Sequence, residues 1–340
     1  MNVHLYKIEC LTNLHVGSGD INYNVVDNEV EKDINGYAMI HSSGLKGALR
    51  EHAEQAALKV YKEKKKKIEN DEKQAAEEKA EEVPKEETEE EKAKREDEEK
   101  KAKKERDKKL LEECMKPVIN IFGQESGSKE IQKGSYKFLD ANIICRPLRV
   151  YGSSSMASIP VFSIDSINSF LRKINNFGIK ELKAKVNGEE VTVDVSQYSD
   201  GLNGSLFDFD REMECADGTK KVEKYEFITN ESGIYIEGEK TAEFSDTAKN
   251  ILKKFEVVLG EHYAVVNNFD HYPLPVLARN YLVDGTSKNL WYEEVVPHGS
   301  VFYTIIITPD KTNALNMEEI KQIGGHASIG CGFTRFIKLN

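Results

Sequence analysis

Alternating hydrophobic and polar residues predict a β-strand at the start of the chain. In residues 3–11, VHLYKIECL, the side chains of Tyr6, Ile8 and Cys10 share one face. Successive side chains of a strand point to opposite faces, so this face is expected to be buried. Further on, SSGLKGALREHAEQAALKVY begins with Ser42 and Ser43, which are favoured helix caps, and continues with apolar residues at helical spacing. We therefore expect a helix beginning at these serines.

Similar patterns in the second half of the chain set the fold class. A strand is expected in FLDANIICRPLR, ending at Pro147. Two helices and three strands are expected after it: helices over 165–176 and 245–260, and strands over 276–283, 288–296 and 300–308. The element order is then β, α, β followed by β, α, β, which favours an α+β fold of the ferredoxin-like or RRM-like type.

Two insertions interrupt this order. Residues 62–113 contain 18 Lys/Arg and 21 Asp/Glu among 52 residues, with few large apolar side chains and one breaker, Pro84. They have no heptad seam, so we expect a solvated helical or disordered insertion and not a coiled coil. Residues 183–240 alternate and carry four turn dipeptides, as hairpins do. The whole chain, 1–340, is expected to form one elaborated domain that contains these two insertions.

Composition excludes several classes of protein. The net charge of the 340 residues is −11, which disfavours unspecific coating of nucleic acid unless a narrow basic stripe exists. The five cysteines are widely spaced without a C-x-x-C pair, so a zinc site or a disulfide framework is not expected. No stretch approaches 18 apolar residues, so we expect a soluble, cytoplasmic protein without a membrane partner.

Two segments have the composition of phosphate-binding sites. Lys46 and Arg50 lie four residues apart near the start of the expected helix, so both project from one face beside exposed amides. Near the C-terminus, GGHASIGCG offers a cluster of glycines whose amides can approach an anion closely. The alternatives are a solvated helix face and a tight structural turn. The glycines are Gly324, Gly325, Gly330 and Gly332.

Three further segments carry candidate catalytic side chains. Asp27 in VVDNEVEKD and His15 in LHVGSG could form a metal site or an acid–base pair for phosphodiester cleavage, the alternative for Asp27 being a turn residue. LWYEEVVP places Tyr292, Glu293 and Glu294 on a strand. Alternation directs one glutamate to solvent and the other to the core or a cleft, and the alternative is edge-strand charge.

Taken in order, these segments resemble the RAMP superfamily of CRISPR proteins. The matching motifs are LHVGSG, VD, SSGLKGALRE, IFGQ, FLDANIICRPLR, LPVLARNYLVD, LWYEEVVP and a terminal GGxxxIGxG. The stretch LWYEE-x-x-P most resembles the repeated backbone subunit of the type III-B Cmr complex. The resemblance implies an RRM-like palm, copies of which form a helical filament along a CRISPR guide RNA together with other Cmr complex subunits.

The resemblance also implies roles for individual residues. A hairpin thumb, placed within 183–240, would displace a nucleotide from the duplex of guide and target RNA at regular intervals. Asp27 would be the catalytic residue of a metal-dependent endoribonuclease and would bind Mg²⁺ or another divalent cation, with His15, Tyr292 and Glu293 or Glu294 as assistants. Guide phosphates would contact Ser42, Ser43, Lys46, Arg50, Arg279, Gly324, Gly325, Gly330 and Gly332.

The expected reaction is attack of a ribose 2′-OH on the adjacent phosphate of complementary target RNA, which leaves a 2′,3′-cyclic phosphate and a 5′-hydroxyl. Such a step needs little beyond positioning and charge stabilisation. Three alternatives stay open: a non-catalytic RNA-binding scaffold, the equivalent backbone subunit of a type III-A complex, and a structural protein that uses its charged run as an interaction arm.

Overall fold

Strand β1 (Asn2–Cys10) lies at the centre of a three-strand group. It pairs antiparallel with β16 (Val301–Thr308) on one side and with β18 (Phe333–Lys338) on the other. Its expected inner face is buried at Tyr6, Ile8 and Cys10, and Leu5 on the opposite face is buried as well. The predicted strand is therefore confirmed, and both of its faces are covered.

The computed structural model describes residues 1–19, 26–79, 89–124, 132–153, 155–186, 189–214, 219–309 and 320–340. These residues divide into two compact units, one made of 1–48 with 137–340 and the other of 49–136. In the first unit a mixed sheet runs in the order β11-β12-β10-β13-β5-β4-β16-β1-β18-β17, with β2 beside β4 and β3 beside β16. The remaining sheet strands are β2 (Met39–Ile40), β3 (Lys137–Phe138), β4 (Ala141–Tyr151), β5 (Ser158–Ser163), β10 (Phe227–Thr229), β11 (Tyr235–Ile236), β12 (Glu239–Glu243), β13 (Ala264–Val266) and β17 (Lys321–Gln322).

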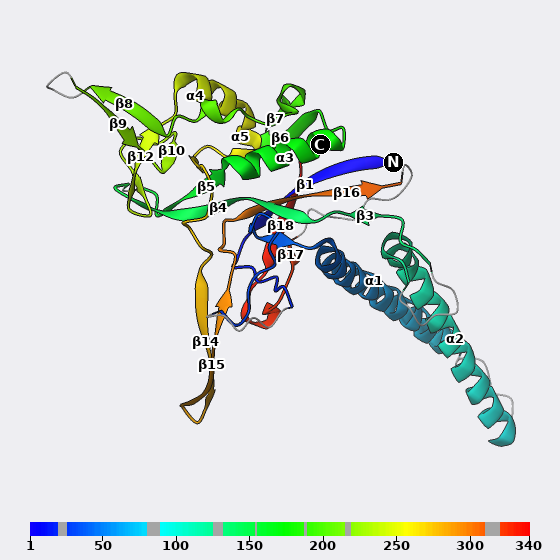
Figure 1. Ribbon diagram of the computed structural model, residues 1–340. Helices are drawn as coiled ribbons and strands as arrows, with labels where there is room; N and C mark the ends of the chain where they lie inside the picture. The colour runs from blue at the N-terminus through cyan, green and yellow to red at the C-terminus, as the bar shows by residue number, and fades with distance from the viewer. Residues whose placement is uncertain are drawn as a thin grey trace. The chain divides into compact units, whose positions relative to one another are not determined.

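Helices cover one face of this sheet (Figure 1). They are α3 (Ile164–Asn176), α4 (Asp246–Leu252) and α5 (Glu256–Leu259), the last two separated by a 3₁₀ turn over Lys253–Phe255. Phe170 of α3 and Leu252 of α4 share one apolar core with Phe162 of β5. The expected α+β class is confirmed, whereas the helix expected over 245–260 is broken in two.

Strand β4 corrects one boundary. It was expected to end at Pro147, but it continues to Tyr151. Its pairing with β16 has already ended at Cys145, and the residue opposite Pro147 on β5 is another proline, Pro160. Proline cannot donate a backbone hydrogen bond within a sheet. The two facing prolines lie where β5 is the only strand paired with β4, so β4 continues past them.

The segment 183–240 forms hairpins, as expected, but much of it belongs to the palm. One hairpin is β6 (Glu181–Val186) with β7 (Glu189–Asp194), and another is β8 (Asp210–Glu214) with β9 (Lys220–Lys224). Leu202 and Phe207, however, are buried in the core under the helices, and β10 to β12 join the main sheet. Two of the expected turns, 187–188 and 217–218, lie outside the described residues.

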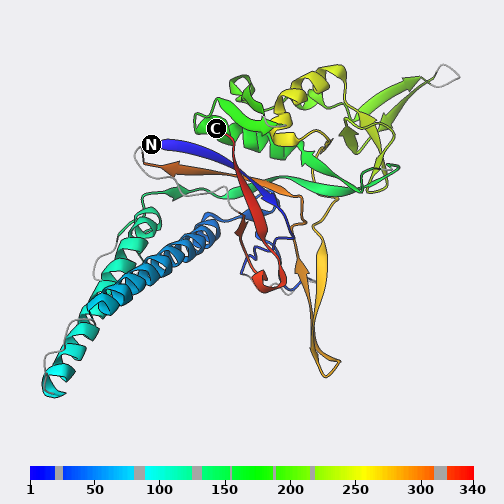
Figure 2. The same cartoon turned by 180° about the vertical axis from the view of Figure 1, so that it is seen from behind.

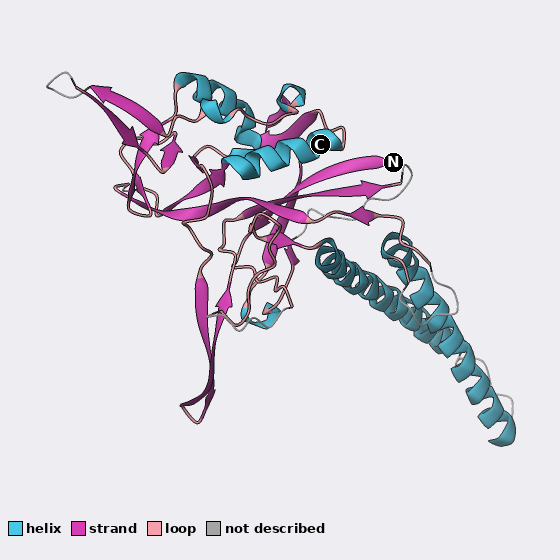
Figure 3. Cartoon of the chain, in the orientation of Figure 1, coloured by secondary structure: helices cyan, strands magenta, loops and turns pink. Residues whose placement is uncertain are grey.

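A different hairpin also projects from the palm. Strands β14 (Val276–Val283) and β15 (Thr286–Glu294) form a separate two-stranded ribbon that extends away from the side of the sheet opposite α3 to α5 (Figures 1 and 3). Asp284 and Gly285 turn between them with φ of 50° and 75°, as a two-residue hairpin loop requires. Six of its apolar side chains are 37–59% exposed: Val276, Tyr281, Leu282, Val283, Leu290 and Tyr292.

The charged run forms two long helices, α1 (Ser42–Lys79) and α2 (Glu89–Phe122), which run side by side (Figure 2). Ion pairs cross between them, for example from Lys65 to Asp107 at 2.6 Å and from Lys103 to Glu69 at 3.4 Å, and their order shows that the helices are antiparallel. The helical alternative is therefore confirmed for the described residues. Pro84 lies outside these residues, and α2 continues beyond the charged run to Phe122 with Pro117 inside it.

None of the helices in the described part of the chain has an apolar stretch of membrane-spanning length.

Candidate functional site

The segment that contains Asp27 runs beside the end of β15, at the root of the β14–β15 hairpin, where β14 begins and β15 ends. The amides of Asp27 and Asn28 donate to the carbonyl oxygen of Tyr292 at 3.0 and 3.2 Å. The amide of Glu294 donates to the carbonyl oxygen of Asn28 at 2.9 Å. Asn28 and Glu293 thereby form an isolated parallel bridge. The VD motif and the LWYEE motif, 265 residues apart, are thus held side by side.

The side chain of Asp27 is exposed but oriented. Its Oδ2 atom accepts a hydrogen bond from the backbone N–H of Tyr292 at 2.8 Å, and the residue itself is exposed. This hydrogen bond and the one from the Asp27 amide fix both the carboxylate and the backbone of Asp27 against Tyr292. The arrangement presents a single carboxylate to solvent in a defined orientation.

Glu293 is the most densely contacted carboxylate of the site. Its side chain is only 1% exposed. Oε1 accepts from Trp291 Nε1 at 2.6 Å and from Asn28 Nδ2 at 3.3 Å, and Oε2 lies 3.1 Å from both Arg279 Nε and His326 Nε2. Burial alone would raise the pKa of Glu293, but the donors from Trp291, Arg279 and Asn28 and the charge of His326 outweigh it and hold the pKa below its ordinary value. Glu293 is therefore an anion that organises its neighbours.

Glu294 is buried too, at 7% exposure, and its Oε2 accepts from Val30 N at 3.1 Å and from Lys32 Nζ at 2.9 Å. The expectation that one of the two glutamates faces solvent is therefore wrong. Strand alternation separates two faces, but here other segments cover both: the glycine loop supplies His326 to Glu293, and residues 30–32 enclose Glu294. Edge-strand charge is excluded by the same burial.

His15 is a buried residue of this site. Its Nδ1 lies 2.8 Å from the carbonyl oxygen of Glu294, so Nδ1 carries the proton and donates. The ring lies 5.3 Å from that of His326, centroid to centroid. With the histidine 7% exposed and bonded to Glu294 O, its imidazole holds the segment around His15 against the end of β15.

The glycine loop packs closely on neighbouring backbone. The amides of Gly325, Gly330 and Gly332 donate to carbonyl oxygens of His15, Ala327 and Asn13 at 2.8, 3.1 and 2.8 Å. A Cβ atom at Gly324 would lie 2.4 Å from His15 O, and one at Gly332 would lie 2.0 Å from Ile323 O. These amides are engaged within the chain, so the geometry favours the tight structural turn, and contact with guide phosphates stays a prediction.

The start of α1 contains the second group of residues that are expected to contact phosphates. The Ser42 amide donates to Asp140 Oδ1 at 2.6 Å, and the Ser43 hydroxyl lies 2.8 Å from His41 Nδ1. Arg50 Nε donates to Glu54 at 2.7 Å along the same helix. One helix amide is thus already capped by a carboxylate. Lys46 is half-buried, and the proposed phosphate contacts here stay predictions.

The structure brings together Asp27, His15, Tyr292, Glu293, Glu294 and Arg279 at the hairpin root, with Gly324 and Gly325 packed on His15. Sequence reasoning missed three donors to Glu293: Asn28, Trp291 and His326. A histidine inside a glycine-rich loop is a signal that could have marked His326. The other two are recognisable only once the segments meet.

A divalent cation at this site would need ligands besides the protein side chains. Among the described residues, no three His, Cys, Asp or Glu side chains form a group that could hold a metal ion. Asp27 offers one exposed carboxylate with one oxygen already accepting from Tyr292 N. Mg²⁺ is commonly held by one or two carboxylates, with water and substrate phosphates completing its shell. The residues therefore fit a cation shared with a phosphate ligand, and not one enclosed by protein side chains.

Comparisons with known proteins agree on the fold. A family model described as the RAMP superfamily matches residues 7–335. A comparison with curated protein sequences gives no match. The fold resembles a chain of the type III-B Cmr-beta complex bound to cognate target RNA, with a TM-score of 0.59 and 16% identity, covering 99% of this chain and 97% of that one.

Two further structures are similar. A chain of the apo state of Cmr-beta gives a TM-score of 0.57 at 15% identity and covers 99% and 96% of the two chains. Oligomeric Cmr4 from Pyrococcus furiosus gives 0.50 at 14% identity and covers 99% and 98%. At these identities the likeness establishes a shared fold.

Proposed function

Since this chain belongs to the RAMP superfamily, we propose that it is a guide-RNA-binding backbone subunit of a type III-B CRISPR complex in the cytoplasm. In this role it cleaves complementary target RNA at regular intervals. Similar structures support the proposal, since one contains cognate target RNA and another is oligomeric Cmr4. The partners would be guide RNA, target RNA, further copies of the chain and other subunits of the complex.

The observation that carries the catalytic part is the placement of Asp27. It is an exposed carboxylate anchored by the backbone of Tyr292, at the root of a hairpin that projects from the palm. A target RNA strand that contacts this hairpin would lie close to the carboxylate of Asp27. When copies of the chain are stacked, the same carboxylate recurs at a fixed spacing, which predicts cuts separated by a constant step.

The reaction places modest demands on the protein. The 2′-oxygen attacks the adjacent phosphorus, the bond to the 5′-oxygen breaks, and the products carry a 2′,3′-cyclic phosphate and a 5′-hydroxyl. A divalent cation held at Asp27 would stabilise the negative charge that grows on the phosphate. The residues of the chain fix geometry: Tyr292 N orients Asp27, and Glu293 contacts Arg279 and His326 and holds them in place.

The assistants differ in what they can contribute. The side chain of Tyr292 is 40% exposed and can contact RNA directly. Glu293 and Glu294 are buried and paired, so we assign them to positioning. Guide phosphates would be held by charge at Lys46, Arg50 and Arg279, by the hydroxyls of Ser42 and Ser43, and by the loop that contains Gly324, Gly325, Gly330 and Gly332.

The test is target cleavage by the reconstituted complex with end-labelled RNA. Wild-type protein should give fragments that differ by a constant length and end in a cyclic phosphate. Asp27→Ala should abolish cutting while assembly and target binding persist, and Glu29→Ala, two residues along the same loop, should cut normally. Unchanged cleavage by Asp27→Ala would leave the non-catalytic scaffold as the function, and the identity of co-purifying subunits distinguishes type III-B from type III-A.

A further inference from the structure

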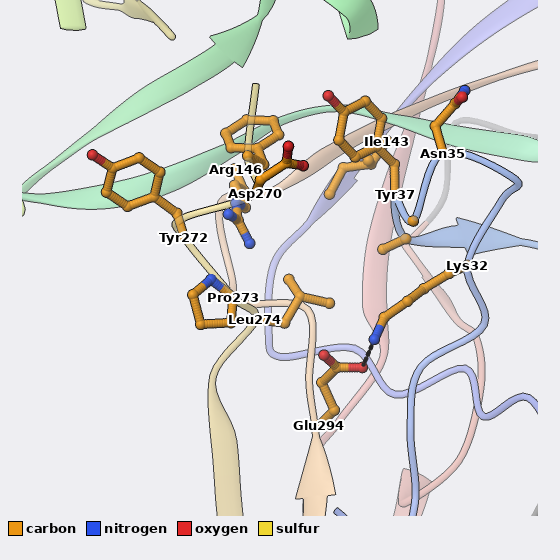
Figure 4. A pocket seen from close by; sticks show the side chains of 13 residues that line it. Lys32, Asn35, Tyr37, Ile143, Arg146, Asp270, Tyr272, Pro273, Leu274 and Glu294 are labelled. Atoms are coloured by element: carbon orange, nitrogen blue, oxygen red, sulfur yellow. Dashed lines mark ion pairs between the residues drawn. The ribbon is translucent and has the colours of Figure 1, made fainter. Parts of the chain in front are cut away.

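A cavity of about 200 Å³ opens beside the root of the β14–β15 hairpin. Its walls come from the loop before β14, from residues 32–38 and from β4 (Figure 4). Arg146 of β4 and Lys32 extend into it from different segments, and Lys32 is paired with Glu294 (Figure 4). Glu294, assigned above to positioning, lines the cavity, but neither the cleavage chemistry nor the guide contacts described above use Arg146.

Arg146 is the unusual residue of the cavity. It is only 5% exposed, yet its Nε and Nη2 atoms have no hydrogen-bond partner among the residues that the structure describes. Its guanidinium stacks on the ring of Phe269 at 4.3 Å. Burial lowers the pKa of Arg146 to about 10, although the charge of Glu294 acts in the opposite direction. A buried cation with two unused donors is costly, so the arrangement points to a ligand that accepts from both.

The two unused atoms define the shape of that ligand. Nε and Nη2 form one edge of the planar guanidinium, and their N–H bonds run parallel. Three common groups accept from such an edge with two atoms: a carboxylate, a phosphate, and guanine through O6 and N7. The face of the guanidinium is already occupied by Phe269, which leaves the edge for recognition.

Charge and aromatic walls select among these groups. The charged side chains around the cavity are two of each sign, Lys32 and Arg146 against Asp270 and Glu294, so the site has no net positive charge to attract an anion. Tyr37 stands edge-on to Phe269 at 5.8 Å, and Tyr272 is a further aromatic wall. A neutral planar ring with two acceptors suits this environment better than a phosphate or a carboxylate does.

We propose that this cavity binds an unstacked guanine base of single-stranded RNA, with O6 and N7 of the base accepting from Nε and Nη2 of Arg146. Both nitrogens are shielded from water in this structure, so the base reaches them only after a local rearrangement around Arg146. The inference rests on the proposed RNA binding but not on cleavage. Because the cavity adjoins the hairpin root, a base turned out of its stack there lies within reach.

The experiment measures binding of the full chain to short single-stranded RNAs that differ at one central position. Wild-type protein should bind the RNA with guanine about tenfold more tightly than the RNAs with adenine or 7-deazaguanine, since each substitute lacks an acceptor that Arg146 uses. Arg146→Met should remove this preference and leave the affinity for the adenine RNA unchanged. Arg149→Met is the matched control, since it removes an exposed arginine of the same strand and should keep the preference.

Each result decides the inference. Equal affinity of wild-type protein for guanine and 7-deazaguanine overturns it while the proposed function stands. Uniform weakening of every RNA by Arg146→Met, beyond that of Arg149→Met, identifies a phosphate contact and also overturns it. Failure of the wild-type chain to bind any RNA rejects the RNA-binding role together with this inference. Should Arg146→Met fold poorly, Arg146→Lys keeps the charge without the parallel donors and should likewise lose the preference.

Discussion

Asp27 and Tyr292 are joined by two hydrogen bonds in opposite directions. The amide of Asp27 donates to the carbonyl oxygen of Tyr292 at 3.0 Å, and the amide of Tyr292 donates to Oδ2 of Asp27 at 2.8 Å. The second bond makes the carboxylate part of the backbone pairing between the two segments. Asp27 therefore has a structural role as well as the proposed catalytic one, and the two can be separated.

Asp27→Asn tests this separation. An asparagine keeps an oxygen that can accept from Tyr292 N but loses the negative charge, so the anchor should persist and cation binding should fail. We expect cleavage of target RNA to fall by about 100-fold or more, with an unchanged melting temperature. Asp27→Ala loses both properties, and a lower melting temperature for alanine than for asparagine would confirm the anchor. Full activity of the asparagine variant would show that the charge is dispensable.

Glu293→Gln tests the buried anion. Since hydrogen bonds to charged groups contribute about 2 kcal/mol, we expect a loss of that order in the free energy of unfolding at neutral pH. The folded-state pKa lies below the ordinary value of 4.5, so the ionised form stabilises the fold above pH 4.5, and this contribution is lost as the pH falls through the folded-state pKa.

The measurement is denaturant unfolding of both proteins from pH 7 down to pH 3. The gap in stability between wild type and Glu293→Gln should be widest at neutral pH and should close as the solution becomes acidic. A gap that stays constant over this range would mean that the charge of Glu293 contributes nothing.

Gly332→Ala and Gly330→Ala form a matched pair in the glycine loop. Both positions have φ near +82°, so alanine costs about 1–2 kcal/mol of backbone strain at either. Only at Gly332 would the added Cβ collide with backbone, at 2.0 Å from Ile323 O, whereas Gly330 has open space. We expect Gly332→Ala to lose a further 1–3 kcal/mol, roughly, in thermal or chemical unfolding. Equal losses would contradict the packing described for this loop.

Shortening the helical insertion tests whether the charged run is needed. Lys65 and Asp107 form an ion pair across α1 and α2 at 2.6 Å, so residues 66–106 can be replaced by a short Gly-Ser linker at that point. The core beneath α3 to α5 contains no residue of this run. We expect unchanged folding and target cleavage in the complex. Loss of assembly or target binding would instead assign the run to an interaction arm.

Several elements were predictable because their signals are local. The expected strand over 276–283 coincides with β14, and the expected helix over 165–176 differs from α3 by one residue. The Asp284-Gly285 dipeptide between two alternating segments also marks the hairpin loop, although the thumb was sought within 183–240 and that assignment stays a prediction. Period and turn chemistry act over a few residues, so the sequence expresses them directly.

The candidate site was only partly predictable. The ordered motifs pointed to Asp27 and to Glu293 or Glu294, but nothing in LWYEEVVP shows that both glutamates are buried. That burial depends on His326 from the glycine loop and on Lys32 from another segment. Alternation predicts which side chains share a face, but it does not predict what covers that face.

The sequence by itself determined the α+β class, the presence of a charged insertion and, through the order of its motifs, the resemblance to the RAMP family, whereas the structure decided that the described part of the charged run is helical. Only the tertiary structure decided that Glu293 is a buried anion with donors from separate segments, that the amides of Gly325, Gly330 and Gly332 are engaged within the chain, and that Arg146, which lines a cavity, keeps two buried donors without partners among the described residues. The physical reason is that local conformation depends on neighbours in sequence, whereas burial and hydrogen bonding depend on neighbours in space, which the folded chain brings together from hundreds of residues apart.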